Sequence, residues 1–228
     1  QTLDHTPVFV HGGPFANIAQ GTNTIIATKM GLSLADYVVT EAGFGADLGA
    51  EKFLHIKCQY GKMKPDAYVI VATIRALRYQ GGAKKGEYEN PNLPYLKNGF
   101  GNLAKHIENG FKFGFKPIVA INHFATDSLE EINYIIDECE KLGVKAILAD
   151  EFTKGGAGMT ELAEEVVRCA EFYGNDFKPL YQVEDSVEHK IDTIAKEVYG
   201  AESVVYSQKA KNQLKTIYDL GFDKVPIC

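Results

Sequence analysis

The stretch Ala67-Tyr68-Val69-Ile70-Val71-Ala72 carries the clearest strand signal in the chain. Its side chains are apolar or β-branched and Pro65 bounds the run, as expected for a strand that is buried in a sheet. Similar short runs predict strands at residues 7–10, 36–40, 117–121 and 145–149. Helical patterns separate and follow these runs, at residues 17–32, 48–57, 95–113, 128–142 and 159–173.

Alternation of strands and helices at this spacing predicts a mostly parallel sheet with helices on both faces, which is the doubly wound α/β class. The organisation changes after about residue 175, where we predict helices at residues 185–199 and 207–220 and no strong strand. The sequence therefore predicts two parts. Residues 1–175 form the α/β part, and residues 176–228 form a small helical part that is an appendage or the start of a second domain.

The net charge of the 228-residue chain is −6 at pH 7. A nucleic-acid partner requires clustered Lys and Arg side chains, so this charge argues against one. No apolar run approaches the roughly 20 residues that a membrane-spanning helix needs. The four cysteines are scattered without a C-x-x-C spacing, which argues against a zinc site or a redox pair and is typical of a reducing compartment. We expect a cytoplasmic protein without nucleic-acid or membrane partners.

Glycines and polar residues gather where predicted strands end. In parallel sheets ligands bind beyond the carboxyl ends of the strands, and glycine lets the backbone approach a ligand closely. Each of the segments that combine these features follows or ends a predicted strand. They are residues 11–19 (HGGPFANIA), 40–53 (TEAGFGADLGAEKF), 71–82 (VATIRALRYQGG) and 120–127 (AINHFATD).

Together these segments resemble formate–tetrahydrofolate ligase, also called formyltetrahydrofolate synthetase, over essentially all 228 residues. The resemblance implies a P-loop NTPase-like fold. It also implies a reaction in which ATP and formate give formyl phosphate, whose formyl group passes to tetrahydrofolate to give 10-formyltetrahydrofolate. ATP with Mg²⁺, a monovalent cation (K⁺ or NH₄⁺) and a homotetramer are implied as well.

The phosphate-binding motif of that fold, Gly-x-x-x-x-Gly-Lys-Ser/Thr, does not occur in this sequence. We therefore interpret the chain as part of a longer ligase, inactive on its own. In this interpretation residues 1–175 are the C-terminal portion of the nucleotide- and folate-binding domain.

Two aromatic residues follow neighbouring predicted strands and could clamp a flat pterin ring between them. They are Phe124 and Phe152, and the resemblance implies that these positions hold the folate ring. The family often has Trp in place of Phe152 and Pro in place of Ala125, which lies in the same site. Lys154 precedes three glycines and could neutralise a carboxylate or phosphate, or could be a solvated lysine. The alternative for both Phe side chains is that they fill the core at the end of the sheet.

A second set of residues is assigned to the cleft for nucleotide and formyl phosphate. A Gly-Gly turn before a helix can place backbone N–H groups around an anion. His11 could donate to phosphate oxygens or could be structural, and Glu41 could help to hold a metal-bound nucleotide. The set is His11, Gly12, Gly13, Glu41, Gly43, Gln80, Gly81, Gly82 and Asn122.

Other polar residues near these segments could have a structural or a functional role. Asp47 is expected to cap the following helix. Arg75 could form a surface ion pair or could reach an anionic substrate. The family more often has Lys and His where this chain has Arg78 and Gln80, so an acid–base role for Gln80 is not expected. The sequence assigns no catalytic residue and no certain metal ligand.

Two other functions compete with the ligase. The chain could be a non-catalytic module that binds folate or a nucleotide. It could also be a Rossmann-type dehydrogenase, which needs Gly-x-Gly-x-x-Gly after its first strand. Gly43 and Gly45 match the first half of that motif, but Leu48 stands where its third glycine belongs.

Overall fold

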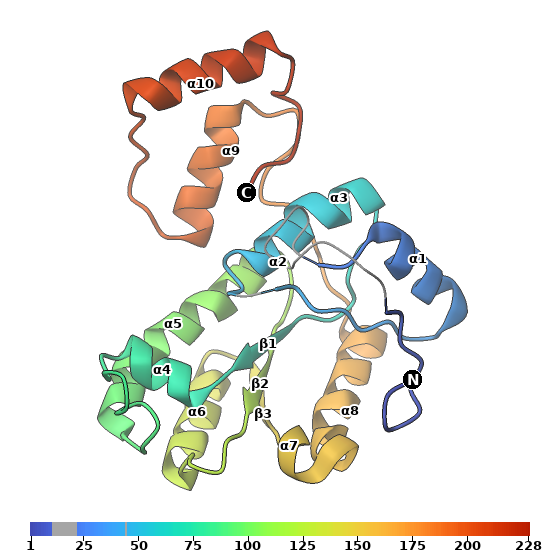
Figure 1. The fold of residues 1–228 in the computed structure, drawn as a ribbon, viewed down its shortest axis with the longest axis vertical. Coiled ribbons are helices and arrows are strands. Elements are labelled where there is room, and N and C mark those ends of the chain that lie inside the picture. Colours follow the sequence, from blue (N-terminus) through green and yellow to red (C-terminus); the bar gives the residue numbers. More distant parts are fainter. Residues whose placement is uncertain (11–21, 44) are drawn as a thin grey trace. The chain divides into compact units, whose positions relative to one another are not determined.

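The computed structural model describes residues 1–10, 22–43 and 45–228 (Figure 1). The candidate residues His11, Gly12 and Gly13 lie outside the described residues. The chain divides into two compact units. One unit is residues 65–177, and the other combines residues 1–64 with residues 178–228.

The unit of residues 65–177 is built on a three-stranded parallel sheet with the order β1-β2-β3. The strands are β1 (Val69–Ala72), β2 (Ile118–Asn122) and β3 (Lys145–Ala149). Ala72 pairs with Ile121, and Asn122 pairs with Ala149, so the three carboxyl ends are nearly level. These strands confirm the predictions at residues 67–72, 117–121 and 145–149, and the predicted α/β class with a parallel sheet.

Helices cover both faces of this sheet, because its strands alternate their buried side chains between two apolar clusters. On one face, Val119 and Ile121 pack with α4 (Ile74–Gln80), α5 (Leu93–Lys112) and α6 (Leu129–Lys141). On the other face, Ile118 and Ala120 pack with α8 (Thr160–Arg168), which continues as a π-helical turn over Cys169–Tyr173. Figure 1 shows α5 and α6 on one side of the strands and α8 on the other.

Side-chain caps fix where the helices of this unit begin. Thr73 caps α4 and Asn92 caps α5, each by accepting a hydrogen bond from a backbone N–H in the first turn. Ser128 caps α6 and forms a capping box with Glu131.

Glycine lets α4 and α5 pack backbone against backbone. A Cβ atom on Gly99 would overlap the carbonyl oxygen of Leu77, and a Cβ atom on Gly81 would overlap that of Tyr95. The next glycine, Gly82, has a φ of +105°, a conformation that L side chains rarely adopt. Close helix contact and chain reversal therefore account for the glycines at the end of α4.

The unit of residues 1–64 and 178–228 is helical in its regular parts. It contains α1 (Ile25–Leu34), α2 (Gly49–Lys52), α3 (Cys58–Gly61), α9 (Val187–Thr193) and α10 (Gln208–Asp219). A π-helical turn over Phe53–Lys57 joins α2 to α3, and another over Ile194–Val198 extends α9. The predicted helices at residues 48–57, 185–199 and 207–220 are confirmed.

A buried histidine connects the early and late parts of this unit. His55 Nδ1 lies 2.7 Å from Glu51 Oε1, and Leu180 donates its backbone N–H to His55 Nε2 over 3.0 Å. The His55 ring also lies 4.3 Å from the Tyr181 ring, centroid to centroid. Burial raises the pKa of Glu51, and its hydrogen bond with His55 opposes that rise.

Two predicted strands were wrong. Residues 7–10 and 36–40 are irregular, and no strand pairs with them among the described residues. Val10 and Val39 are each 89% exposed, so neither run is buried as a strand between helices would be. Of the helix predicted at residues 17–32, residues 17–21 lie outside the described residues, and the described helix α1 begins at Ile25 after its cap Thr24. No described helix is both long enough and apolar enough to cross a membrane.

Candidate functional site

The candidate site lies at the carboxyl edge of the sheet in the unit of residues 65–177. β1 ends before Thr73, β2 ends at Asn122 and β3 ends before Asp150. Because the strands are parallel and paired in register, the loops that follow them leave the sheet at the same edge. His123 donates its backbone N–H to the carbonyl of Ala149 over 3.0 Å, which ties the second loop to the third strand.

A tight turn holds Phe124 in place. Phe124 donates its backbone N–H to Asp127 Oδ2 over 2.9 Å, and Asp127 donates its own N–H to the Phe124 carbonyl over 2.8 Å. Asp127 directly precedes Ser128, the cap of α6. The backbone that carries the Phe124 ring is therefore anchored to the start of a helix.

Arg75 lies over the face of the Phe124 ring. The guanidinium carbon is 4.2 Å from the ring centroid, and Nη2 donates to Thr126 Oγ1 over 3.3 Å. Such cation–π contacts stabilise by about 0.5–2 kcal/mol. No carboxylate pairs with Arg75 among the residues that the structure describes. The guanidinium is thus held by an aromatic face and a hydroxyl, at the edge where the loops converge.

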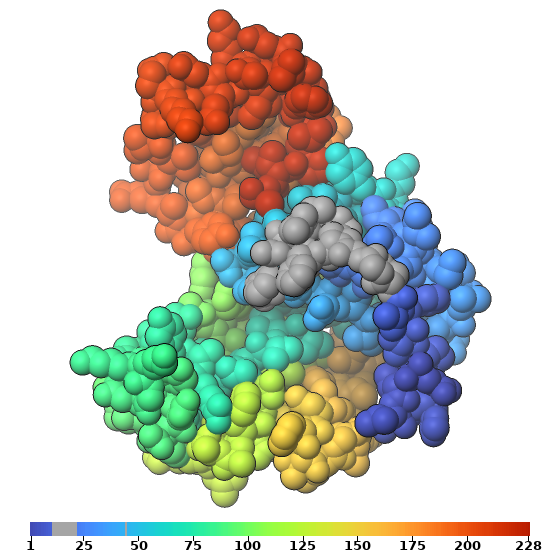
Figure 2. Space-filling view, in the orientation of Figure 1, coloured from blue at the N-terminus to red at the C-terminus, as the bar shows by residue number. Residues whose placement is uncertain are grey.

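Phe152 lies on the neighbouring loop and faces solvent. It belongs to α7 (Glu151–Lys154), and 95% of its surface is exposed. The 3₁₀ turn Gly155–Met159 follows α7, and this segment lies at the surface in the space-filling view (yellow to gold in Figure 2). The alternative that Phe152 fills the core is therefore excluded. In the described part of the chain no ring contact joins Phe152 to Phe124.

Asp150 is the charged centre of the third loop. Its carboxylate lies 3.0 Å from Lys154 Nζ through Oδ2 and 3.2 Å from His123 Nδ1 through Oδ1. The hydrogen bond from Lys154 lowers the pKa of Asp150, and the one from His123 adds to that effect. The Asp150 carboxylate therefore bridges the second and third loops in its ionised form.

A buried ion pair supports the second loop from behind. Arg78 forms two hydrogen bonds with the carboxylate of Glu131, and its Nη1 donates to the carbonyl of Tyr88 over 3.0 Å. Asp127 Oδ1 lies 3.6 Å from Arg78 Nη2. Arg78 is thus held within the protein, linking α4, α6 and the turn that carries Phe124.

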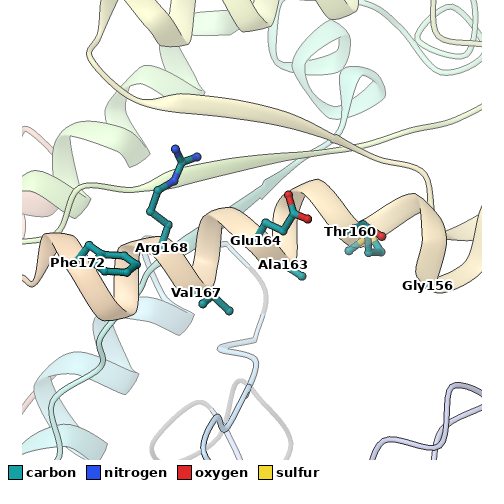
Figure 3. Close-up of a pocket in the computed structure, with 8 residues that line it drawn as sticks. Gly156, Thr160, Ala163, Glu164, Val167, Arg168 and Phe172 are labelled. Carbon is teal, nitrogen blue, oxygen red and sulfur yellow. The ribbon is translucent and has the colours of Figure 1, made fainter.

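A shallow groove of about 710 Å³ runs along α8, from Gly156 in the turn after α7 to Phe172 (Figure 3). Ala163 and Val167 project to one side of the helix, whereas Glu164 and Arg168 project to the other (Figure 3). None of the residues proposed from sequence lines the groove. We therefore place the candidate site at the strand ends.

The family model for formate–tetrahydrofolate ligase matches residues 1–228. The chain belongs to the formate–tetrahydrofolate ligase family. The match covers both units of the structure, including the loops at the sheet edge. Members of this family are ligases that act in one-carbon metabolism, with formate, tetrahydrofolate and ATP as substrates.

Some of the residues predicted for this ligase site come together in the structure, and others do not. Asn122 ends β2, and the segments that follow β2 and β3 carry Phe124, Ala125, Phe152 and Lys154. Gln80, Gly81 and Gly82 lie at the C-terminal end of α4, one helix length from the end of β1. Glu41 is exposed in the other unit, where the buried Gly43 packs closely against Gly49.

Sequence reasoning missed the His123–Asp150 pair of this ligase-family chain. The signal was present, because one residue is the first after β2 and the other is the first after β3. It also missed Glu131, whose position in the first turn of α6 suggested only a capping role. In both cases the sequence did not reveal the contact, because the two residues of each pair are distant in the sequence and meet only in the folded protein.

Proposed function

We propose that this chain forms the tetrahydrofolate-binding wall of an ATP-dependent ligase that joins formate to tetrahydrofolate. The match of residues 1–228 to the ligase family carries the proposal. In the proposed reaction ATP phosphorylates formate, and N10 of tetrahydrofolate takes the formyl group from formyl phosphate. The products are 10-formyltetrahydrofolate, ADP and phosphate.

The pterin ring is proposed to stack on Phe124. Arg75 covers one face of that ring, so the pterin would use the opposite face. Phe152 would close on the pterin from the neighbouring loop, a role that its nearly complete exposure supports. Ala125 and Lys154 belong to the same proposed site because they lie on the same two loops. Flat aromatic faces combined with apolar burial suit a bicyclic ligand.

The nucleotide part of the function is proposed on the resemblance. It comprises a P-loop NTPase-like fold, ATP with Mg²⁺, a monovalent cation and a cytoplasmic homotetramer. The described residues contain no cluster of three His, Cys, Asp or Glu side chains that could hold a metal ion. The residues proposed for this cleft remain His11, Gly12, Gly13, Glu41, Gly43, Gln80, Gly81, Gly82 and Asn122.

The organisation of the ligase is proposed in the same way. Residues 1–175 would belong to the nucleotide- and folate-binding α/β domain, and residues 176–228 to a helical appendage or second domain. Phosphoryl transfer needs positioning and charge neutralisation by a phosphate-binding loop. Because the sequence lacks that motif, the 228 residues are proposed to be inactive in formate activation without a further segment.

Calorimetry with a reduced folate tests the binding wall. We expect Phe124→Ala to weaken folate binding by about tenfold, because it removes the stacking surface. Phe172→Ala is the matched control, since Phe172 is also exposed (74%) but lies in the π-helical turn that follows α8 and not on the loops at the strand ends. Equal affinity of the Phe124→Ala variant and the wild type would overturn the proposed site.

A non-catalytic binding module is the second candidate function. The absence of the Gly-x-x-x-x-Gly-Lys-Ser/Thr motif from the sequence favours it. Formate-dependent ATP turnover separates the two candidates. The full-length ligase polypeptide carrying this region should hydrolyse ATP only with formate and tetrahydrofolate present. Folate binding without turnover in that polypeptide would favour the binding module.

A further inference from the structure

The pair formed by His123 and Asp150 joins two loops at the candidate site. His123 is bound through its backbone to Ala149, the residue before Asp150, so the two side chains are brought together by the sheet itself. Nδ1 of His123 lies 3.2 Å from Oδ1 of Asp150. The Asp150 side chain is 9% exposed and that of His123 is 23% exposed, which leaves the imidazole partly accessible to solvent.

The pairing determines which nitrogen of the imidazole carries a proton. An ionised carboxylate can only accept hydrogen bonds, so His123 Nδ1 must donate, and Nε2 of the neutral ring then keeps its lone pair. Lys154 holds the same carboxylate from its other side through Oδ2, at 3.0 Å. Among the described residues, no hydrogen bond or ion pair involves His123 Nε2. A basic nitrogen with a fixed orientation is therefore available to a ligand.

Formyl transfer to an amine needs such an acceptor. The lone pair of the amine attacks the carbonyl carbon of formyl phosphate and forms the C–N bond. The C–O bond to phosphate breaks, and phosphate leaves with that electron pair. The nitrogen is left with one proton too many, and this proton must go to a base. A general base oriented by a carboxylate is a recurring solution to this problem.

We propose that His123 Nε2 accepts the proton that leaves the attacking nitrogen, and that Asp150 is the positioning residue that orients the imidazole. The proposal rests on the proposed function, since it assigns a role within the same formyl transfer. His123 directly precedes Phe124, the proposed pterin platform, which places the imidazole beside the reduced folate. A purely structural role, in which the pair only ties the two loops together, is the competing explanation.

The variant His123→Asn separates these explanations. An Asn amide can still donate to Asp150 from nearly the same position as Nδ1, but it has no equivalent of Nε2. In the full-length ligase polypeptide, we expect kcat to fall by about 100-fold or more while KM for tetrahydrofolate changes by less than about threefold. His189→Asn is the matched control, because His189 is 60% exposed in the other unit, and it should leave kcat unchanged.

Imidazole supplied in solution gives a second measurement that does not depend on the shape of Asn. We expect it to restore part of the activity lost in His123→Ala and none of the smaller loss in Asp150→Asn, where the histidine is still present. A kcat of His123→Asn close to that of the wild type would overturn the inference. So would a loss of activity that imidazole does not relieve, or one explained by a raised KM. Wild-type ligase without formate- and tetrahydrofolate-dependent turnover would instead overturn the proposed function, and the inference with it.

Discussion

Arg78 and Glu131 are 53 residues apart in the chain and form a bidentate ion pair inside the protein, with Nε–Oε1 at 2.8 Å and Nη2–Oε2 at 2.7 Å. Glu131 Oε1 also accepts the backbone N–H of Asn92 over 2.9 Å, and its Oε2 accepts the Ser128 hydroxyl over 2.7 Å. One carboxylate therefore connects the starts of α5 and α6 to α4. It also braces the turn that carries Phe124.

We expect Arg78→Met to lower the free energy of unfolding by about 3–5 kcal/mol, because it leaves the Glu131 carboxylate buried without its cation. Lys141→Met is the control. Lys141 pairs with Glu138 on the surface, at 2.6 Å, and such exposed pairs contribute about 0–1 kcal/mol. Urea unfolding measures both.

The double variant Arg78→Met, Glu131→Met extends this test. Removing both charges should recover much of the stability lost in the single variant, because no buried charge is then left unpaired. An Arg78→Met variant as stable as Lys141→Met would contradict the role assigned to the pair.

Acid should weaken the protein through the same carboxylate. Burial by itself would raise the pKa of Glu131, but hydrogen bonds from Arg78, Ser128 and the N–H of Asn92 outweigh it and lower the pKa from 4.5 to about 2. A folded-state pKa below the unfolded value means that the stabilisation is complete above about pH 4.5 and is lost as pH falls toward 2. Unfolding free energies measured across this window should fall less steeply for Glu131→Gln than for the wild type. Parallel curves would show that Glu131 is not the group responsible.

Two glycines in α5 should respond in opposite ways to the same substitution. Gly99→Ala is expected to destabilise by roughly 1–3 kcal/mol, because its Cβ would overlap the Leu77 carbonyl and force α4 and α5 apart. Gly101→Ala should be neutral or stabilising by up to about 1 kcal/mol, since nothing lies within 4 Å of the added atom and alanine favours the helix. Thermal or urea unfolding of both variants measures the two changes in the free energy of unfolding. A Gly99→Ala variant as stable as Gly101→Ala would refute the close helix packing.

Replacing Phe152 by the residue that the family often has should strengthen folate binding. We expect Phe152→Trp to tighten the Kd of a reduced folate by about 2–10-fold, because indole offers a larger face and a donor. Phe172→Trp, on the opposite end of α8 from the loop of Phe152, should leave the Kd unchanged. Calorimetry measures both, and an unchanged Kd for Phe152→Trp would remove Phe152 from the proposed pterin site.

Short apolar runs in the sequence were sufficient to predict the three strands of the sheet. The apolar run of residues 67–72 predicted β1, and the runs at 117–121 and 145–149 predicted its neighbours. The same signal misled at residues 7–10 and 36–40, where apolar runs of similar length pair with no strand among the described residues. A strand needs a partner for its backbone N–H and C=O groups, and the amino-acid pattern of one segment does not supply that partner.

For the candidate site, too, the sequence predicted some features and not others. Its location could be predicted, because parallel strands deliver their carboxyl ends to one edge, and Phe124 and Phe152 follow two adjacent strands. The contacts between side chains within the site could not be predicted from the sequence. Arg75 was expected to pair with a carboxylate or an anion and instead stacks on Phe124. Lys154 was considered as a partner for a ligand, and in the structure it binds Asp150.

The sequence alone determined the three paired strands β1, β2 and β3, the α/β class of the fold, the family and the loops that hold the proposed site, but it did not determine the irregular course of residues 7–10 and 36–40. These features depend on residues that are close together in the chain, or on patterns long enough to be distinctive. The tertiary structure decided the pairing of His123 with Asp150, the burial of Arg78 against Glu131, and the exposure of Phe152. The physical reason is that such contacts join residues tens of positions apart, and their energies exist only once the sheet has brought the loops together.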